Sequence, residues 1–525
     1  MYLTAKRWLL VAAVFVAGAM IALIASCTPV NNELSRSALR AQPVAAKTLR
    51  IGISEDPDVL DPVLGRTFVG RIVFASLCDK LFDLAPDLNI IPQLATENTL
   101  SEDGKTLTLK LRQGVVFHDG EPFNAAAVKY NLERSLKLPG SNRKGEIKAI
   151  NSIEVVDEYT IKLILSTPSS PLLAQLTDRA GMMISPKAGE ALGEKFGQKP
   201  VCSGPFKFTE RVSQDRIVVE RFDRYWNKDA IAIDKIIFLP IPDDSVRLSN
   251  LRSGDLDLIE RVNPNDRQIA SKDAQLELTE AVSLGYQGIS INLANPKPLE
   301  TPLAKDPRVR RAFELSLDRN IINKVVYDGE FVPGNQPVPP DNRFYIKEFP
   351  MPKRDLPQAK ALLKEAGYDT VKFTLMVPNS PESLLLGQVI QVLAKEAGFD
   401  IALNAVEFAT TLDLAEAGKF EAYQSAWSGR IDPDGNIYSF NTCEGPRNDG
   451  HYCDKEVDNL LNLARTTNDF QQRYKYYQQA TERYLKSAPI IYLYHAKLLW
   501  AYTKKLTGFK PYPDGIIRPQ GLAMN

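Results

Sequence analysis

Short stretches of this chain alternate apolar and polar residues, which is the pattern of strands with one buried face. The clearest are residues 48–54, 106–111 and 286–293. Between them lie apolar positions with helical spacing, as at residues 69–82 and after Asn124, whose side chain can cap a helix. The alternation of the two patterns predicts an α/β fold.

Two segments in the second half share one local pattern. Ala366-Gly367-Tyr368 precedes a predicted strand at 371–377, and Ala397-Gly398-Phe399 precedes another at 401–406. A glycine followed by an aromatic residue is typical of a helix end in which the glycine adopts a left-handed conformation. A helix-to-strand unit that occurs twice predicts parallel strands in a layered sheet.

The first 27 residues indicate export. Lys6 and Arg7 precede an apolar run at 8–25, the pattern of a secretory signal. The run ends in Ile24-Ala25-Ser26-Cys27, which resembles a lipobox, so we expect residues 1–27 to be a lipoprotein signal with Cys27 lipidated. A transmembrane anchor is the alternative, because the run is long enough to span a bilayer. Residues 28–47 are polar and are expected to form a flexible tether.

Composition is that of a folded extracytoplasmic body. Of the 525 residues, 44% are hydrophobic and 24% charged. Sixty-four basic residues balance 64 acidic ones, and loss of Lys6 and Arg7 with the signal gives 62 − 64 = −2. A nucleic-acid partner needs a basic face and is not expected. A chain of this length is expected to form two lobes or more.

The five cysteines suggest disulfides in an oxidising compartment. With Cys27 lipidated, four remain. Cys443 and Cys453 bracket a polar loop and are expected to form a disulfide. Cys78 and Cys202 would form the second, and two buried free thiols are the alternative.

The segment Ala426-Trp427-Ser428-Gly429-Arg430-Ile431-Asp432-Pro433-Asp434-Gly435 carries the candidate chemistry. It places an aromatic ring beside a cation and two carboxylates, and its glycines and proline fix the backbone. Such a loop is suited to line a small-molecule pocket. An ordinary surface turn with Trp427 in the core is the alternative.

The whole chain resembles one large family, the extracellular solute-binding proteins of ABC importers in the peptide/nickel/oligopeptide group. The residues that carry the resemblance follow in family order: Leu60-Asp61-Pro62, Leu94-Ala95-Thr96, Leu109-Lys110-Leu111-Arg112, Gly114, Phe117-His118-Asp119-Gly120-Glu121-Pro122-Phe123, Gly204-Pro205-Phe206, Val309-Arg310-Arg311-Ala312, Ala366-Gly367-Tyr368 and Trp427-Ser428-Gly429.

This resemblance implies a two-lobed periplasmic-binding-protein fold of class C, the Venus-flytrap type, with an extra subdomain in lobe one. Lobe I would span 48–283 with the subdomain at about 89–190, lobe II 284–498, and residues 499–525 would return to lobe I. Crossings near Gly285 and Leu498 would form the hinge.

The implied function is that of a receptor, not an enzyme. It would need no cofactor or metal, act as a monomer anchored by lipid at the periplasmic or extracellular face, and deliver its ligand to the permease subunits of the importer. The expected ligand is a di- or oligopeptide or a peptide-like, possibly acidic compound. An opine, glutathione, a nickel complex, haem or a sugar is the alternative.

Two other classes are more remote. A secreted hydrolase would need a nucleophile with a base, but the chain has only three histidines and neither a Gly-x-Ser-x-Gly nor a His-Glu-x-x-His motif. A periplasmic chaperone would bind unfolded chains broadly, whereas a receptor would saturate one-to-one with a small solute.

The resemblance also bears on Arg430. In family members that bind peptides, an Asp that meets the ligand's ammonium group follows Trp-x-Gly, whereas here a cation follows. We expect Trp427 to pack on the ligand and Arg430 to bind an acidic group, with Asp432 and Asp434 free to meet an ammonium. Alternatively, Arg430 forms an ion pair with Asp432 or Asp434 and does not meet the ligand. The pocket would then be assigned to Asp432, Asp434 and Tyr286.

Overall fold

The computed structural model describes residues 47–297 and 299–525, and its largest element is a seven-stranded sheet. Residues 1–46, with the predicted signal, Cys27 and most of the tether, lie outside the described residues. The strand order is β12 (Leu276–Val282), β19 (Lys497–Thr503), β11 (Leu258–Ile259), β1 (Thr48–Ile53), β10 (Lys235–Pro240), β9 (Arg216–Arg221) and β8 (Phe206–Val212). Its helices are α1 (Phe68–Leu77), α5 (Pro186–Leu192), α6 (Asp244–Ser253) and α7 (Arg267–Lys272).

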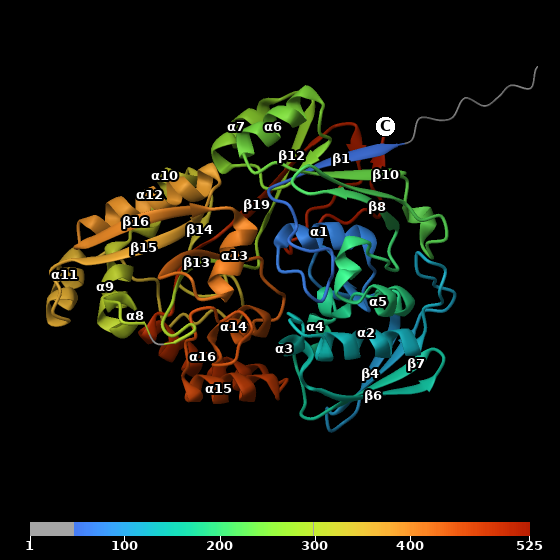
Figure 1. The fold of residues 1–525 in the computed structure, drawn as a ribbon, viewed down its shortest axis with the longest axis horizontal. Coiled ribbons are helices and arrows are strands. Elements are labelled where there is room, and N and C mark those ends of the chain that lie inside the picture. The colour runs from blue at the N-terminus through green and yellow to red at the C-terminus, as the bar shows by residue number, and fades with distance from the viewer. Residues whose placement is uncertain (1–46, 298) are drawn as a thin grey trace, which may run out of the picture. The chain divides into compact units, whose positions relative to one another are not determined.

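A second, six-stranded sheet is built from the second half of the chain (Figure 1). Its order is β14 (Val332–Pro333), β18 (Ile490–His495), β13 (Tyr286–Ile291), β17 (Ala422–Trp427), β15 (Val371–Pro378) and β16 (Phe399–Val406). The helices of this half are α8 (Pro302–Lys305), α9 (Pro307–Ser316), α10 (Arg319–Tyr327), α11 (Leu356–Glu365), α12 (Pro381–Lys395), α13 (Phe408–Glu416), α14 (Asp434–Asn441), α15 (Lys455–Arg465) and α16 (Phe470–Ser487).

A four-stranded antiparallel sheet forms a separate layer within the first half. It consists of β4 (Ala95–Leu100), β5 (Thr106–Leu111), β7 (Thr160–Leu165) and β6 (Ile150–Asp157), with α2 (Ala125–Lys137), α3 (Lys144–Ile147) and α4 (Leu172–Gln175). Asn124 caps α2 as predicted, because its side chain accepts a hydrogen bond from the backbone of Ala127. Two short strand pairs complete the fold: β2 (Phe82–Leu84) with β3 (Ile90–Pro92), and β20 (Leu506–Thr507) with β21 (Ala523–Met524).

The repeated helix-to-strand pattern is confirmed. Gly367 and Gly398 follow the ends of α11 and α12 with φ values of 88° and 108°, in the left-handed region. The strands that come next, β15 and β16, pair in parallel along their whole length. The predicted helix at 69–82 is too long, because α1 ends at Leu77 and Cys78 is already extended.

The chain passes between the two large sheets twice, and both passages lie side by side. The first joins β12 to β13 through Gly285, and the second joins β18 to β19 through Ala496. Ser283 donates its backbone N–H to Ala496, and Nδ1 of His495 lies 2.7 Å from the carbonyl oxygen of Gly285. The second passage lies two residues before the expected Leu498, because Lys497 and Leu498 already pair with β12.

Both disulfides expected from the cysteine count are present. Cys443–Cys453 closes a short loop after α14, and Cys78–Cys202 joins the end of α1 to the segment before β8. The pairing of Cys78 with Cys202 excludes the alternative of two free thiols.

Candidate functional site

A cleft beside the two passages is lined by residues from both halves of the chain. Its first part, here called the central compartment, contains about 1210 Å³ of empty space, part of it open to solvent. Aromatic side chains form much of its wall: Phe68, Phe331, Phe408, Tyr423, Trp427, Phe440 and Tyr494. The cations Arg66, Arg261, Arg447 and Lys497 and the acids Glu382 and Asp449 also reach it.

The cleft continues into a second cavity, here called the acidic compartment, of about 1090 Å³, also partly open. Arg261, Glu382 and Tyr494 line both compartments, so the two are continuous. A concave cavity whose wall combines aromatic side chains with a small number of polar and charged groups is the usual form of a small-molecule site.

Trp427 lies at the end of β17 and is held in a defined orientation. Its indole N–H donates to Oδ1 of Asn436 at 2.9 Å, and its ring packs edge-on against Phe440. The loop that follows is fixed to the first passage. A Cβ on Gly285 would lie 1.7 Å from the carbonyl oxygen of Trp427, so only glycine allows this approach. Trp427 and Ser428 therefore present fixed surfaces to the central compartment.

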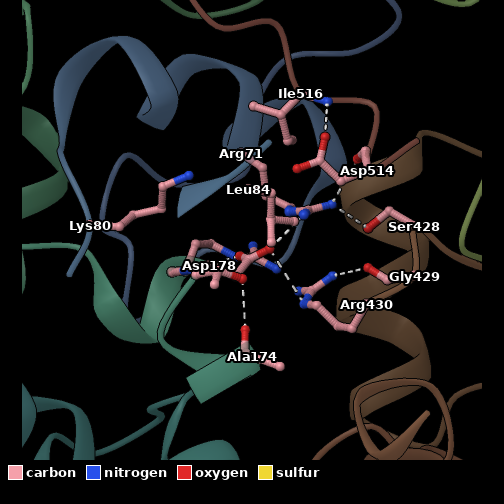
Figure 2. A network of polar contacts seen from close by, with 12 residues as sticks. Arg71, Lys80, Leu84, Ala174, Asp178, Ser428, Gly429, Arg430, Asp514 and Ile516 are labelled. Carbon is pink, nitrogen blue, oxygen red and sulfur yellow. Dashed lines mark hydrogen bonds and ion pairs between the residues drawn. The ribbon is translucent and has the colours of Figure 1, made fainter. Parts of the chain in front are cut away.

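Arg430 is buried, with 6% of its surface exposed, and it does not line the central compartment. Its guanidinium stacks on Trp427, and Nε lies 3.4 Å from Oδ2 of Asp178, in the other half of the chain. Figure 2 shows Arg71 converging on the same carboxylate from α1. Arg71 also donates to Oγ of Ser428 at 3.0 Å, so this cluster joins the two halves behind the Trp427 loop.

The cluster determines the charge state of Asp178. Burial alone would raise its pKa, but the guanidinium groups of Arg430, Arg71 and Arg179 outweigh burial and hold the pKa well below its usual range. The carboxylate is therefore ionised, and its charge is balanced by the surrounding guanidinium groups. Arg430 is one of these groups, and it does not face the central compartment.

The alternative, that Arg430 pairs with Asp432 or Asp434, is not found, because both carboxylates pair with other arginines. Arg473 donates two hydrogen bonds to Asp432, at 2.8 and 3.0 Å, and Arg465 donates two to Asp434, at 2.6 and 2.7 Å. Neither carboxylate lines either compartment, so neither is placed to meet a ligand's ammonium group.

Tyr286 also lies outside both compartments. It is 2% exposed and packs edge-on against Phe440 and Tyr492 in the core behind Trp427. Its position supports the aromatic wall without forming part of it.

Several residues that reach the cleft were missed by the sequence analysis. Arg447 and Asp449 stand in the loop that the Cys443–Cys453 disulfide closes, and Asp449 accepts a hydrogen bond from Tyr423 at 2.5 Å. Charged residues inside a disulfide-closed loop are a signal that could have identified them. Arg261 has φ of 53°, an uncommon conformation for a bulky residue, and such residues concentrate at functional sites.

No helix in the parts of the chain that the structure covers, 47–297 and 299–525, is long and apolar enough to cross a membrane. Over the same ranges, no three His, Cys, Asp or Glu residues are grouped as they would be around a metal ion.

Comparison with known proteins shows to which family the chain belongs. Residues 89–448 match the family model described as "Bacterial extracellular solute-binding proteins, family 5 Middle". The glutathione-binding protein GsiB of Pectobacterium atrosepticum is 31% identical over 494 residues, covering 91% of this chain and 94% of the relative.

Solved structures agree. AgaA from A. tumefaciens R10, in complex with agropinic acid, is 27% identical with a TM-score of 0.83, covering 91% of this chain and 99% of that one. DppA from Helicobacter pylori, in complex with the peptide STSA, is 26% identical with a TM-score of 0.83, covering 91% and 98%. The two-lobed α/β fold predicted from the sequence is confirmed. The chain belongs to the extracellular solute-binding proteins of family 5, the non-enzymatic receptors that deliver a small solute or peptide to an ABC importer.

Proposed function

We propose that this receptor captures a small amino-acid-derived solute that carries both a carboxylate and an ammonium group, such as a short peptide or a peptide-like acid. Two relatives support this class: GsiB is named for glutathione, and the DppA structure holds a peptide. The likeness to AgaA, whose structure holds agropinic acid, keeps an opine as the second candidate.

The observation that carries the proposal is the unused hydrogen-bonding capacity of two guanidinium groups in the central compartment. Arg66 is paired with Asp58, Asp413 and Glu416, and Lys497 with Glu330. Within the described residues, by contrast, the side chains of Arg261 and Arg447 donate no hydrogen bond to protein. Nε of Arg261 lies 3.4 Å from Oε2 of Glu260, which is an ion pair without a hydrogen bond.

Arg447 is the stronger candidate to receive a carboxylate. Its Nη2 is buried without a partner, and burial, together with the nearby Arg143, lowers the pKa of this guanidinium to about 10. It remains charged at neutral pH and can hold a carboxylate through two parallel hydrogen bonds. Asp449, in the same loop, would meet the ammonium group.

In this proposal the residues of the Trp427 segment divide into two layers. Trp427 and Ser428 contact the solute, and Gly429 keeps the backbone close to the first passage. Arg430, Asp432, Asp434 and Tyr286 stand behind them and hold the wall in place. Arg447 therefore takes the carboxylate-binding role that the sequence analysis assigned to Arg430.

The experiment begins with mass spectrometry of solutes that copurify with the protein from its own host. Calorimetry on the identified solute then compares Arg447→Gln with Arg252→Gln, a control whose exposed side chain pairs with Asp273. Arg447→Gln should weaken binding by about 1.5–3 kcal/mol, the usual contribution of a hydrogen bond to a charged group. Equal affinity in both variants, or a solute with no acidic group, would contradict the proposal.

We also propose that Cys27 carries lipid and tethers a monomeric receptor through residues 28–47, with lobe I at 48–283 and 499–525 and lobe II at 284–498. The lipobox-like sequence supports the anchor. Cys27→Ala should move the protein from the membrane fraction to the soluble fraction or leave it uncleaved. Unchanged membrane association would favour a transmembrane anchor at 8–25.

A further inference from the structure

The acidic compartment is lined by more carboxyl groups than cations, which the family's general function does not explain. Five carboxylates line it, and Arg261 is the one cation among the described residues of its wall. They come from both halves of the chain: Glu55, Asp56 and Asp244 from the first, and Glu382 and Glu407 from the second.

Three of these carboxylates have partners within the protein. Asp56 pairs with Arg211 and also accepts from Ser213 and Gln214. Asp244 pairs with Arg247, and Glu407 caps α13 by accepting from the backbone of Thr410. These three are explained by local structure and need no ligand.

Glu55 is different. Only 8% of its surface is exposed, its Oε1 is buried without a hydrogen-bond partner, and the structure gives this side chain no ion pair in the residues it covers. Burying a carboxylate without a hydrogen bond or a counter-charge is costly. Burial raises the pKa of Glu55 to about 8 despite the opposing charge of Arg261.

Glu382 faces the same space from the first turn of α12. Burial, with the charge of Asp244, raises its pKa to about 7, although the hydroxyl of Tyr327 bonds to it. It also forms no ion pair in the described chain. Each half of the protein therefore contributes one carboxyl group without an ion pair to a single space, in which Arg261 is the nearby cation.

The remaining wall suits a cation with several N–H donors. Ser380, Ser383, Asn379, Gln287 and Gln424 supply polar atoms, and Tyr327 and Tyr494 supply aromatic surface. Aromatic rings attract ammonium and guanidinium groups, and carboxylates accept their hydrogen bonds.

We infer that the acidic compartment binds a second cationic group of the solute, an ammonium or guanidinium at the end of a side chain, between Glu55 and Glu382. This inference rests on the proposed function and refines it: the solute is an amino-acid derivative with a basic side chain. Because the two carboxylates come from different halves, such a group would also favour the arrangement in which the halves are together.

The test uses peptide probes in matched pairs that differ in one charge. Alanyl-lysine and alanyl-alanyl-lysine are compared with their norleucine counterparts, and the arginine peptides with their citrulline counterparts, by calorimetry and thermal shift. The protein should bind the cationic member of a pair at least about tenfold more tightly, as one added charged contact implies.

Glu55→Gln and Glu382→Gln should each reduce that preference, and the double variant should abolish it. Glu97→Gln, at an exposed position of β4, is the matched control and should keep it. Gln matches Glu in shape, and the neutral probes measure whether each variant still folds and binds.

The outcomes separate the two proposals. If both members of every pair bind equally well to the unaltered protein, or if Glu55→Gln and Glu382→Gln keep the full preference, the inference is overturned while the proposed function stands. If no probe binds, the short-peptide form of the proposed function is overturned, and with it the inference of a basic side chain.

Discussion

Charged groups from both halves of the protein meet in two clusters, and the two clusters have opposite balances of acidic and basic groups. In the Asp178 cluster, three guanidinium groups, those of Arg71, Arg179 and Arg430, surround one carboxylate. In the acidic compartment, five carboxyl groups and one cation, Arg261, line the described part of the wall, and two of the five pair with Arg211 and Arg247. Burial acts to raise the pKa of both Asp178 and Glu55. The pKa of Asp178 nevertheless lies well below its usual range, whereas the pKa of Glu55 is raised to about 8.

The difference teaches how to separate charges that hold the protein together from charges that recognise a solute. A buried ion whose partners are already in the protein contributes to the structure, whereas a buried ion without them needs one from outside. By this criterion Arg430, although it stands in the most suggestive segment of the sequence, belongs to the framework. Glu55, in an unremarkable acidic loop, belongs to recognition.

The sharpest way to break this comparison is Asp178→Ala. Removing the carboxylate leaves the surrounding guanidinium groups buried without their counter-charge, so the free energy of unfolding should fall by about 3–5 kcal/mol. Urea unfolding measures this, with Asp400→Ala, which loses only an exposed pair with Lys372, as the control expected to change by less than about 1 kcal/mol. Equal losses would show that Asp178 contributes no more to stability than an exposed ion pair does.

The second-largest effect concerns the loop that holds Arg447 and Asp449. Replacing Cys443 and Cys453 together by Ser should cost about 2–3 kcal/mol of stability, because the unfolded chain regains the freedom of a short closed loop. Affinity for the copurified solute should also fall, since the loop positions the free guanidinium. Lost stability with unchanged affinity would remove Arg447 from recognition.

Local patterns were enough to predict much of the fold. Gly367 and Gly398 identified helix ends and parallel strands, because a left-handed residue after a helix is a local requirement. The cysteine count suggested both disulfides. Hydropathy does not record which sheet a strand joins, however, so the change of sheet at Ala496 was expected only from the family resemblance, which placed it two residues later.

The site was less accessible to sequence analysis for a physical reason. Trp427 and Ser428, which line the central compartment, could be selected from the sequence because they stand in one short segment. The partner of Arg430 was missed because Asp178 lies in the other half of the chain, and only the fold brings them together. Glu55 and Glu382 have no sequence signature, because what distinguishes them is the absence of an ion pair in the described structure.

Glu55→Gln should have a smaller effect of opposite sign, since it should stabilise the solute-free protein. The folded-state pKa of about 8 lies above the ordinary 4.5, so Glu55 lowers stability progressively as pH rises between these values. Above pH 8 the variant should be more stable by about 1–2 kcal/mol, less than the full shift implies because the compartment is partly open to water. Near pH 4.5 the two proteins should unfold alike. A variant that is less stable at high pH would show that Glu55 has a partner in the protein.

The smallest effect should come from Ser428→Ala, and it concerns how the Asp178 cluster acts. Arg71 keeps its ion pair with Asp178 in this variant and loses only its hydrogen bond to Ser428, so the cost should be about 0.5–1 kcal/mol. Ser428 and Arg71 belong to different halves of the chain, so the bond exists only while the halves are together.

If the free receptor opens, the loss should appear as a twofold to fivefold weaker affinity for the copurified solute, with little change in unfolding temperature. Calorimetry and thermal unfolding of the solute-free protein separate the two, with Ser249→Ala on α6, whose hydroxyl bonds only within its own helix, as the control. A lower unfolding temperature without a change in affinity would mean that the halves stay together without solute, and that the cluster stabilises the fold instead of the closed state.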